Sequence, residues 1–163
     1  MKHFYVVGNR ASKSLSPLIF NHWFKKYNIK AKYSFLEVSE KGFDKMLTKH
    51  IKGEKTNGLN ITIPFKKNIL KHLDIEDVHS KNIGAVNCVT IGKKIKGTNT
   101  DWKGYLNFIQ KEKIVKNKKI VILGYGGASQ AIYYGLKSSG FKNIIVFNRS
   151  KKTIKLKNVN NYT

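Results

Sequence analysis

Two periods of apolar and polar residues alternate along this chain, and together they predict strands and helices in alternation. Runs with period two, or with continuous apolar character, predict strands at 3–8, 32–38, 58–63, 85–91, 95–98, 119–123 and 143–147. Apolar residues spaced three or four apart predict helices from Ser16 to about Tyr27, over 40–51, after Pro64, after Thr100 and up to Ser139. Ser16 is expected to cap the first of these helices, with Pro17 at its first position. This order predicts an α/β fold.

The segment Asn60–Lys66 is predicted to be a polar strand end. Period two would place Ile61, Ile63 and Phe65 in the core, and Pro64 would end the strand and begin a helix. An amide, a hydroxyl and an ammonium group would then face one space at the strand end, where open α/β sheets bind ligands. The alternative is a polar strand edge that ends in a surface lysine.

The charge of the chain is strongly positive, at +23 over 163 residues, but it forms no basic block. The lysines are scattered, and Arg10 and Arg149 are the two arginines. Because arginine dominates base readout, this pattern favours a lysine-rich solvated surface over nucleic-acid binding. Apolar runs long enough to span a bilayer and clusters of Cys and His are both absent, so neither a membrane partner nor a metal is expected. A single cysteine, Cys88, suits a reducing cytoplasm.

A glycine-rich loop follows the predicted strand 119–123 and opens a helix. Its spacing is Gly124-x-Gly126-Gly127-Ala128, with Ser129 where a third glycine of a dinucleotide fingerprint would stand. Such glycines let a phosphate approach backbone N–H groups at a helix N-terminus. The next strand ends in Asn148-Arg149-Ser150 without an acidic residue. An arginine at this position favours NADP over NAD, because a guanidinium suits the extra phosphate.

Four other polar residues are candidates for a binding site. Ser14 and Ser16 could bind a carboxylate together, or Ser16 could only cap its helix. Asp101 could be a helix cap, or it could form an acid–base pair with Lys66. Asn87, in an apolar run, needs a partner that is either a neighbouring backbone group or a ligand.

In these motifs the chain resembles the shikimate dehydrogenase family over nearly its whole length. The motifs occur in the family's order: Ser14-Leu15-Ser16-Pro17, Asn60-x-Thr62-x-Pro64-x-Lys66, Gly84-Ala85-Val86-Asn87, Asn99-Thr100-Asp101-x-x-Gly104, Gly124-x-Gly126-Gly127-Ala128 and Asn148-Arg149-Ser150. Cys88 stands where the family commonly has threonine, and Phe20 where it often has histidine.

The resemblance implies NADPH-dependent reduction of 3-dehydroshikimate to shikimate in aromatic amino-acid biosynthesis. By match to the family's motifs, Lys66 and Asp101 would be catalytic. Ser14 and Ser16 would hold the substrate carboxylate, and Asn60, Thr62, Asn87 and Asp101 would bind ring hydroxyls. Gly124, Gly126, Gly127 and Ala128 would take the pyrophosphate of NADP, and Asn148, Arg149 and Ser150 its 2′-phosphate. The expected partner is thus a small molecule, and a homodimer is possible.

The expected domains are a substrate-binding α/β domain over 1–100, a linking helix over 101–117 and a partial Rossmann-type NADP-binding domain over 118–163. A single βαβ unit leaves a sheet edge and much of both faces uncovered. We therefore expect the chain to belong to a longer protein and to lack turnover alone, the alternative being a small protein that oligomerises. The rival functions are an NAD-dependent quinate/shikimate dehydrogenase, a non-catalytic polyanion-binding protein and an isolated shikimate-binding module.

Overall fold

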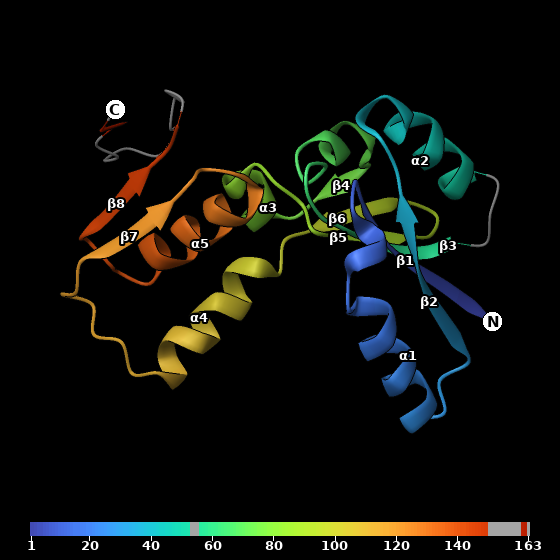
Figure 1. Ribbon diagram of the computed structural model, residues 1–163, viewed down its shortest axis with the longest axis horizontal. Helices are drawn as coiled ribbons and strands as arrows, with labels where there is room; N and C mark the ends of the chain where they lie inside the picture. Colours follow the sequence, from blue (N-terminus) through green and yellow to red (C-terminus); the bar gives the residue numbers. More distant parts are fainter. Residues whose placement is uncertain (53–55, 150–160, 163) are drawn as a thin grey trace.

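The chain forms two β-sheets that lie on opposite sides of the molecule, with helices α3, α4 and α5 between them (Figure 1). The computed structural model describes residues 1–52, 56–149 and 161–162. The larger sheet has the order β2-β1-β3-β5-β6-β4, and the smaller one has the order β7-β8-β9. The predicted α/β class is therefore confirmed.

The larger sheet carries the first part of the chain. Its strands are β1 Lys2–Gly8, β2 Ala31–Glu37, β3 Thr56–Ile61, β4 Ile75–Glu76, β5 Cys88–Ile91 and β6 Ile95–Thr98. Strands β2, β1 and β3 are parallel, and β5 is antiparallel to both β3 and β6. The associated helices are α1 Ser16–Lys26, α2 Phe43–Lys52 and α3 Val78–Ile83, with the short 3-10 turns η1 Ala11–Lys13, η2 Glu40–Gly42 and η3 Asn68–His72.

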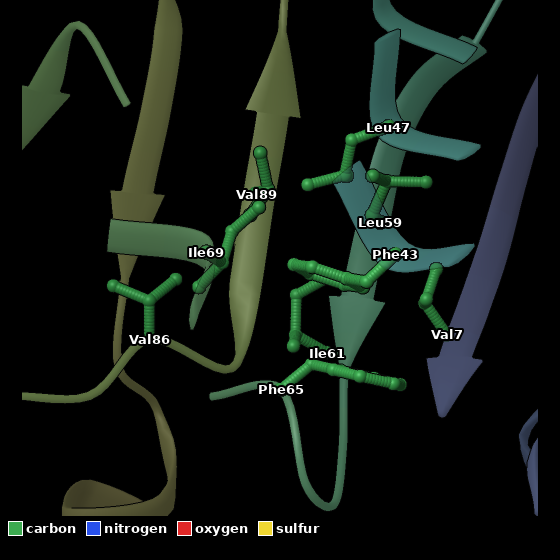
Figure 2. Close-up of a cluster of buried hydrophobic side chains, with 9 residues drawn as sticks. All are labelled: Val7, Phe43, Leu47, Leu59, Ile61, Phe65, Ile69, Val86 and Val89. Carbon is green, nitrogen blue, oxygen red and sulfur yellow. The ribbon is translucent and has the colours of Figure 1, made fainter. Parts of the chain in front are cut away.

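Each face of this sheet has its own core, as a strand period of two requires. On one face, side chains of α2 and η3 pack against the strands. This cluster is composed of Val7, Phe43, Leu47, Leu59, Ile61, Phe65, Ile69, Val86 and Val89 (Figure 2). Within it, the rings of Phe43 and Phe65 stack with centroids 4.2 Å apart. On the other face, Val6 and Tyr33 pack with Phe20 and Phe24 of α1. Asn60, between Leu59 and Ile61, points to this second face.

The smaller sheet contains β7 Ile120–Leu123, β8 Ile144–Phe147 and β9 Asn161–Tyr162, all parallel. Helices α4 Asp101–Lys111 and α5 Gly127–Ser138 pack side by side against it (Figure 1). Their core includes Ile109, Tyr133, Leu136 and Val146.

An aromatic cluster connects the two parts of the chain. The Nδ1 atom of His79 in α3 lies 2.9 Å from the hydroxyl of Tyr134 in α5. The Trp102 ring of α4 contacts both His79 and Tyr134, with centroids 4.5 and 5.7 Å away. Because these side chains come from α3, α4 and α5, they pack the three helices against one another.

The segment after β3 differs from the sequence prediction. The strand ends at Ile61, and the chain then turns, with the Phe65 N–H donating to the Thr62 carbonyl at 2.9 Å. This turn breaks the period of two, so Ile63 is 68% exposed whereas Ile61 and Phe65 are buried. The predicted helix also begins late, because η3 starts at Asn68 rather than at Pro64.

Helix α1 also departs from its predicted form. Ser16 is the first helical residue, and Leu15, which precedes it, makes no side-chain capping hydrogen bond. The expected apolar face is only half buried: Phe20 and Phe24 pack inward, but Trp23 and Tyr27 are 46% and 63% exposed. The predicted capping role of Ser16 was therefore wrong, and its hydroxyl instead accepts a hydrogen bond from Ser14 Oγ.

None of the helices in the described part of the chain is long and apolar enough to cross a membrane.

Candidate active site

Lys66 and Asp101 form an ion pair at the centre of the candidate site. The Lys66 Nζ donates to Asp101 Oδ2 at 2.5 Å, and the two side chains are 13% and 28% exposed. Lys66 comes from the turn after β3, and Asp101 is the first residue of α4. Residues 35 positions apart thus meet because α4 begins beside the turn. The alternative of a solvated surface lysine does not hold.

Asn87 holds the other oxygen of the Asp101 carboxylate. Its Nδ2 donates to Asp101 Oδ1 at 2.7 Å, and its Oδ1 accepts from the Thr100 N–H at 2.9 Å. Asn87 lies just before β5 rather than within it, which differs from the predicted strand 85–91. Its amide therefore has neighbouring partners, and it orients Asp101 toward Lys66.

Asp101 is not held in place as a helix cap. Thr100 occupies the position before α4, and its side chain makes no capping hydrogen bond. The Asp101 N–H donates to Asn99 Oδ1 at 3.0 Å, so the buried side-chain amide two residues earlier accepts from the first N–H of this helix. The Asp101 carboxylate remains available to Lys66.

Tyr33 is a functional candidate that the sequence reasoning missed. It is 3% exposed, it stacks on Phe20 with centroids 4.6 Å apart, and its hydroxyl donates to Asn60 Oδ1 at 2.6 Å. Burial, with a contribution from Cys88, raises the pKa of Tyr33, while a hydrogen bond with Ser16 lowers that pKa in part. The hydroxyl stays protonated, and it fixes the amide oxygen of Asn60. A tyrosine within β2 gives no sequence signal that separates this role from packing.

The two serines of the predicted carboxylate site lie together. Ser14 Oγ and Ser16 Oγ are 3.1 Å apart, and the Ser16 N–H donates to Ser14 Oγ at 3.2 Å. Their loop is tied to β2, because both the N–H and the hydroxyl of Ser12 donate to Glu37 Oε2. These bonds, together with the positive charges of Lys13 and Arg10, lower the pKa of Glu37.

One cavity of about 470 Å³ brings most of these groups together. The predicted substrate-site residues all line it: Ser14, Ser16, Asn60, Thr62, Lys66, Asn87 and Asp101. Arg10, Lys13 and Phe20 line it as well, and sequence reasoning had not assigned them to the site. The cavity thus has hydroxyl and amide donors along its walls, cations at the serine loop and one ion pair.

The glycine loop lies between β7 and α5. Gly124 has φ +88°, a conformation that favours glycine, and a Cβ added at Gly124 or Gly126 would meet nothing within 4 Å. The Tyr125 N–H donates to Asn148 Oδ1 at 3.1 Å, which brings the end of β8 beside the loop. This open cradle at the start of a 12-residue helix fits a phosphate group.

The other predicted cofactor residues are only partly described. Ala128 lies in the first turn of α5, and Arg149 follows β8 as an exposed side chain. Ser150 lies outside the described residues. In the described ranges, no group of three or more His, Cys, Asp or Glu side chains could hold a metal ion.

A sequence model of the shikimate dehydrogenase substrate binding domain matches residues 6–89, which run from within β1 to within β5 and include most of the cavity lining. The chain belongs to the shikimate dehydrogenase family. The resemblance seen in the motifs is thereby confirmed.

Relatives in this family match nearly the whole chain. The shikimate dehydrogenase (NADP(+)) of Pelagibacter ubique is 40% identical over 159 residues, which cover 96% of this chain and 60% of the relative. That of Bacillus cytotoxicus is also 40% identical, over 162 residues that cover 95% of this chain and 57% of the relative. The chain therefore spans 57–60% of the length of these two relatives.

Solved shikimate dehydrogenases have the same fold. Shikimate dehydrogenase 1 from Peptoclostridium difficile superposes with a TM-score of 0.91 at 36% identity, over 99% of this chain and 61% of that one. The enzyme from Thermus thermophilus, solved in complex with NADP(H) and shikimate, gives 0.82 at 28% identity, over 92% and 57%. The chain thus has the fold of the substrate-binding part and the beginning of the Rossmann part.

Proposed function

We propose that this chain supplies the substrate cavity and the first half of the nucleotide site of an enzyme that reduces 3-dehydroshikimate to shikimate with NADPH. The observation that carries the proposal is the Lys66–Asp101 pair, which lies in a polar cavity with every predicted substrate-binding residue in its lining. Membership of the shikimate dehydrogenase family and the names of the relatives support it.

In this proposal the polar side chains that line the cavity recognise the substrate by hydrogen bonds. Ser14 and Ser16 donate hydrogen bonds to the carboxylate, since their hydroxyls already lie 3.1 Å apart on one loop. Asn60, Thr62 and Asn87 bind ring hydroxyls. Site groups that are already held by neighbours bind with little ordering cost, and the bonds of Asn60 to Tyr33 and of Asn87 to Thr100 meet that condition.

Lys66 acts as the proton donor. NADPH supplies a hydride when it is bound. The ketone oxygen of the substrate then gains negative charge. The Lys66 ammonium group stabilises this charge and donates a proton to the oxygen. Asp101 holds the ammonium group in one place through its bond to Nζ, while Asn87 holds Asp101. Groups already in position stabilise developing charge without reorganising.

The glycine loop and the end of β8 would bind NADP. Gly124 and Gly126 leave room for the pyrophosphate beside the start of α5, and Asn148 joins the loop to the end of β8. Arg149 would contact the 2′-phosphate as the arginine of this segment, with Ser150 next to it. The proposed domains are 1–100 for the substrate, 101–117 as the linking segment, in which helix α4 ends at Lys111 and not at 117 as expected, and 118–163 for the cofactor.

Binding and turnover test the proposal separately. Isothermal titration of the 163-residue chain with shikimate should show one site per chain. We propose that the chain alone does not turn over, because it spans 57–60% of its two relatives. Turnover should appear in a hybrid enzyme, in which residues 1–149 are followed by the corresponding remainder of the Pelagibacter ubique relative.

The rival functions predict different results in the same assays. A quinate/shikimate dehydrogenase using NAD would make the hybrid enzyme prefer NAD. A polyanion-binding protein would bind duplex DNA with a steep dependence on salt and would ignore shikimate. An isolated shikimate-binding module would bind shikimate but not NADP. A hybrid enzyme that folds and yet fails to oxidise NADPH with 3-dehydroshikimate would contradict the proposal.

A further inference from the structure

Gly127, the first residue of α5, lies directly against the side chain of Lys66. A Cβ added at Gly127 would lie 3.0 Å from Lys66 Cβ and 3.3 Å from Lys66 Cδ, with Ala85 Cβ at 3.5 Å. The first two distances are shorter than ordinary van der Waals contacts between carbon atoms. The space that a side chain would occupy at position 127 is therefore already taken by the stem of the lysine.

The other glycines of the loop make no such contact. A Cβ at Gly124 or at Gly126 would meet nothing within 4 Å. The loop thus has an open side at Gly124 and Gly126, where a phosphate fits, and a closed side at Gly127, where it touches Lys66. A glycine fingerprint read from sequence gives no sign of this difference.

The surroundings of Lys66 leave it little room to move away from Gly127. Its backbone carbonyl accepts a hydrogen bond from the Val86 N–H at 2.8 Å, which ties the turn to the segment just before β5. Phe65, the preceding residue, and Ala85 are both fully buried. An added methyl group at position 127 would therefore displace the lysine stem or the start of α5.

We propose that Gly127 is a positioning residue for Lys66. Its missing side chain makes the channel through which the lysine stem passes, and so it sets the point at which Nζ meets Asp101 Oδ2. The inference rests on the proposed function of Lys66 as proton donor. It goes beyond that function because it gives a residue of the nucleotide loop a role in the placement of the proton donor.

The test compares Gly127→Ala with Gly92→Ala in the chain. Gly92 lies in the turn between β5 and β6, where a Cβ would meet nothing within 4 Å, so it is a matched control. Each protein is treated briefly with trinitrobenzenesulfonate, and labelling of Lys66 is measured by peptide mass spectrometry. Lys71, whose side chain is 60% exposed, serves as the internal standard.

In the Gly127→Ala chain, Lys66 should be labelled several-fold faster relative to Lys71 than in the unsubstituted chain. The reason is that the added methyl group pushes out the Lys66 side chain, which is otherwise 13% exposed. Gly92→Ala should leave the ratio unchanged. In the hybrid enzyme, Gly127→Ala should lower kcat on the order of 10- to 100-fold, as expected when a reacting group is misplaced. The KM for NADPH should change much less. A folded Gly127→Ala chain in which Lys66 is labelled at the unchanged rate would overturn the proposal. So would a Gly127→Ala hybrid enzyme whose loss of activity comes entirely from a higher KM for NADPH, with kcat unchanged.

A second variant covers the case in which Gly127→Ala does not fold. Lys66→Gly removes the stem, so a chain carrying both substitutions should fold and should unfold at a higher temperature than Gly127→Ala alone. A double variant as unstable as Gly127→Ala would overturn the proposed contact. An unsubstituted hybrid enzyme without turnover would contradict the proposed function instead, and the labelling ratio would still decide the contact.

Discussion

Replacing Asp101 by asparagine tests how much the reaction depends on the held ammonium group. The carboxylate accepts from Lys66 Nζ at 2.5 Å on one oxygen and from Asn87 Nδ2 at 2.7 Å on the other. Asparagine has the same shape but a single oxygen, so one donor loses its acceptor and faces an NH₂ group. A hydrogen bond to a charged group contributes about 1.5–3 kcal/mol. At about 1.4 kcal/mol for each factor of ten, kcat should fall about 10- to 150-fold.

The assay is the oxidation of NADPH by the hybrid enzyme at saturating 3-dehydroshikimate. Asp44→Asn is a matched control, because the Asp44 carboxylate also accepts from two donors, Lys71 at 2.7 Å and His72 at 2.8 Å. That cluster lies outside the residues that line the cavity. Asp44→Asn should leave kcat unchanged. A hybrid enzyme with Asp101→Asn that turns over at the unsubstituted rate would refute the idea that Asp101 holds the proton donor.

Three further substitutions test the core, a helix cap and the choice of cofactor. Phe65→Ala removes a fully buried ring and should lower the free energy of unfolding by about 3–5 kcal/mol in urea titrations, whereas Ile63→Ala, at a 68% exposed position, should change it by less than about 0.5 kcal/mol. Burial raises the pKa of Asp77, but hydrogen bonds, chiefly from Ser80, outweigh this and hold the pKa below its usual value of 3.8. Asp77→Ala should therefore cost about 1 kcal/mol at neutral pH, and in urea titrations the difference from the unsubstituted chain should start to shrink as the pH falls below about 4 and continue to shrink as it falls through the lowered pKa of the folded state. Arg149→Ala should weaken NADP binding about 10- to 150-fold in isothermal titration, because a charge-assisted hydrogen bond to the 2′-phosphate is lost, and NAD binding should stay unchanged. Equal losses of affinity for both nucleotides would argue against that contact.

The elements that depend on local periodicity could be predicted from the sequence. Strands β1, β3 and β7 were recognised by their apolar residues, and helix α2 by its apolar stripe. Strand β4 and helix α3 were missed, because Ile75–Glu76 has only two residues and Val78–Ile83 only six. Segments this short carry too few positions for a period to show, and β4 forms through its parallel pairing with β6.

The candidate site could be predicted only as a set of residues. Lys66 and Asp101 carried a pattern, but their 2.5 Å contact depends on where α4 begins relative to the turn after β3. Tyr33 was missed because a tyrosine in a strand usually indicates packing, and its hydroxyl bond to Asn60 depends on the register of β2, β1 and β3. Ile63 was misplaced because periodicity alone does not reveal where a strand gives way to a turn.

The most direct test of the account is an NMR titration of the ¹⁵N-labelled chain with shikimate. The account predicts saturable shifts for the amides of Ser16, Thr62, Lys66 and Asn87, which line one cavity but come from three separate segments of the chain. The same titration of Lys66→Met should show weaker binding with the remaining shifts in place. A folded chain whose spectrum does not change with shikimate, or changes only outside the cavity lining, would contradict the account.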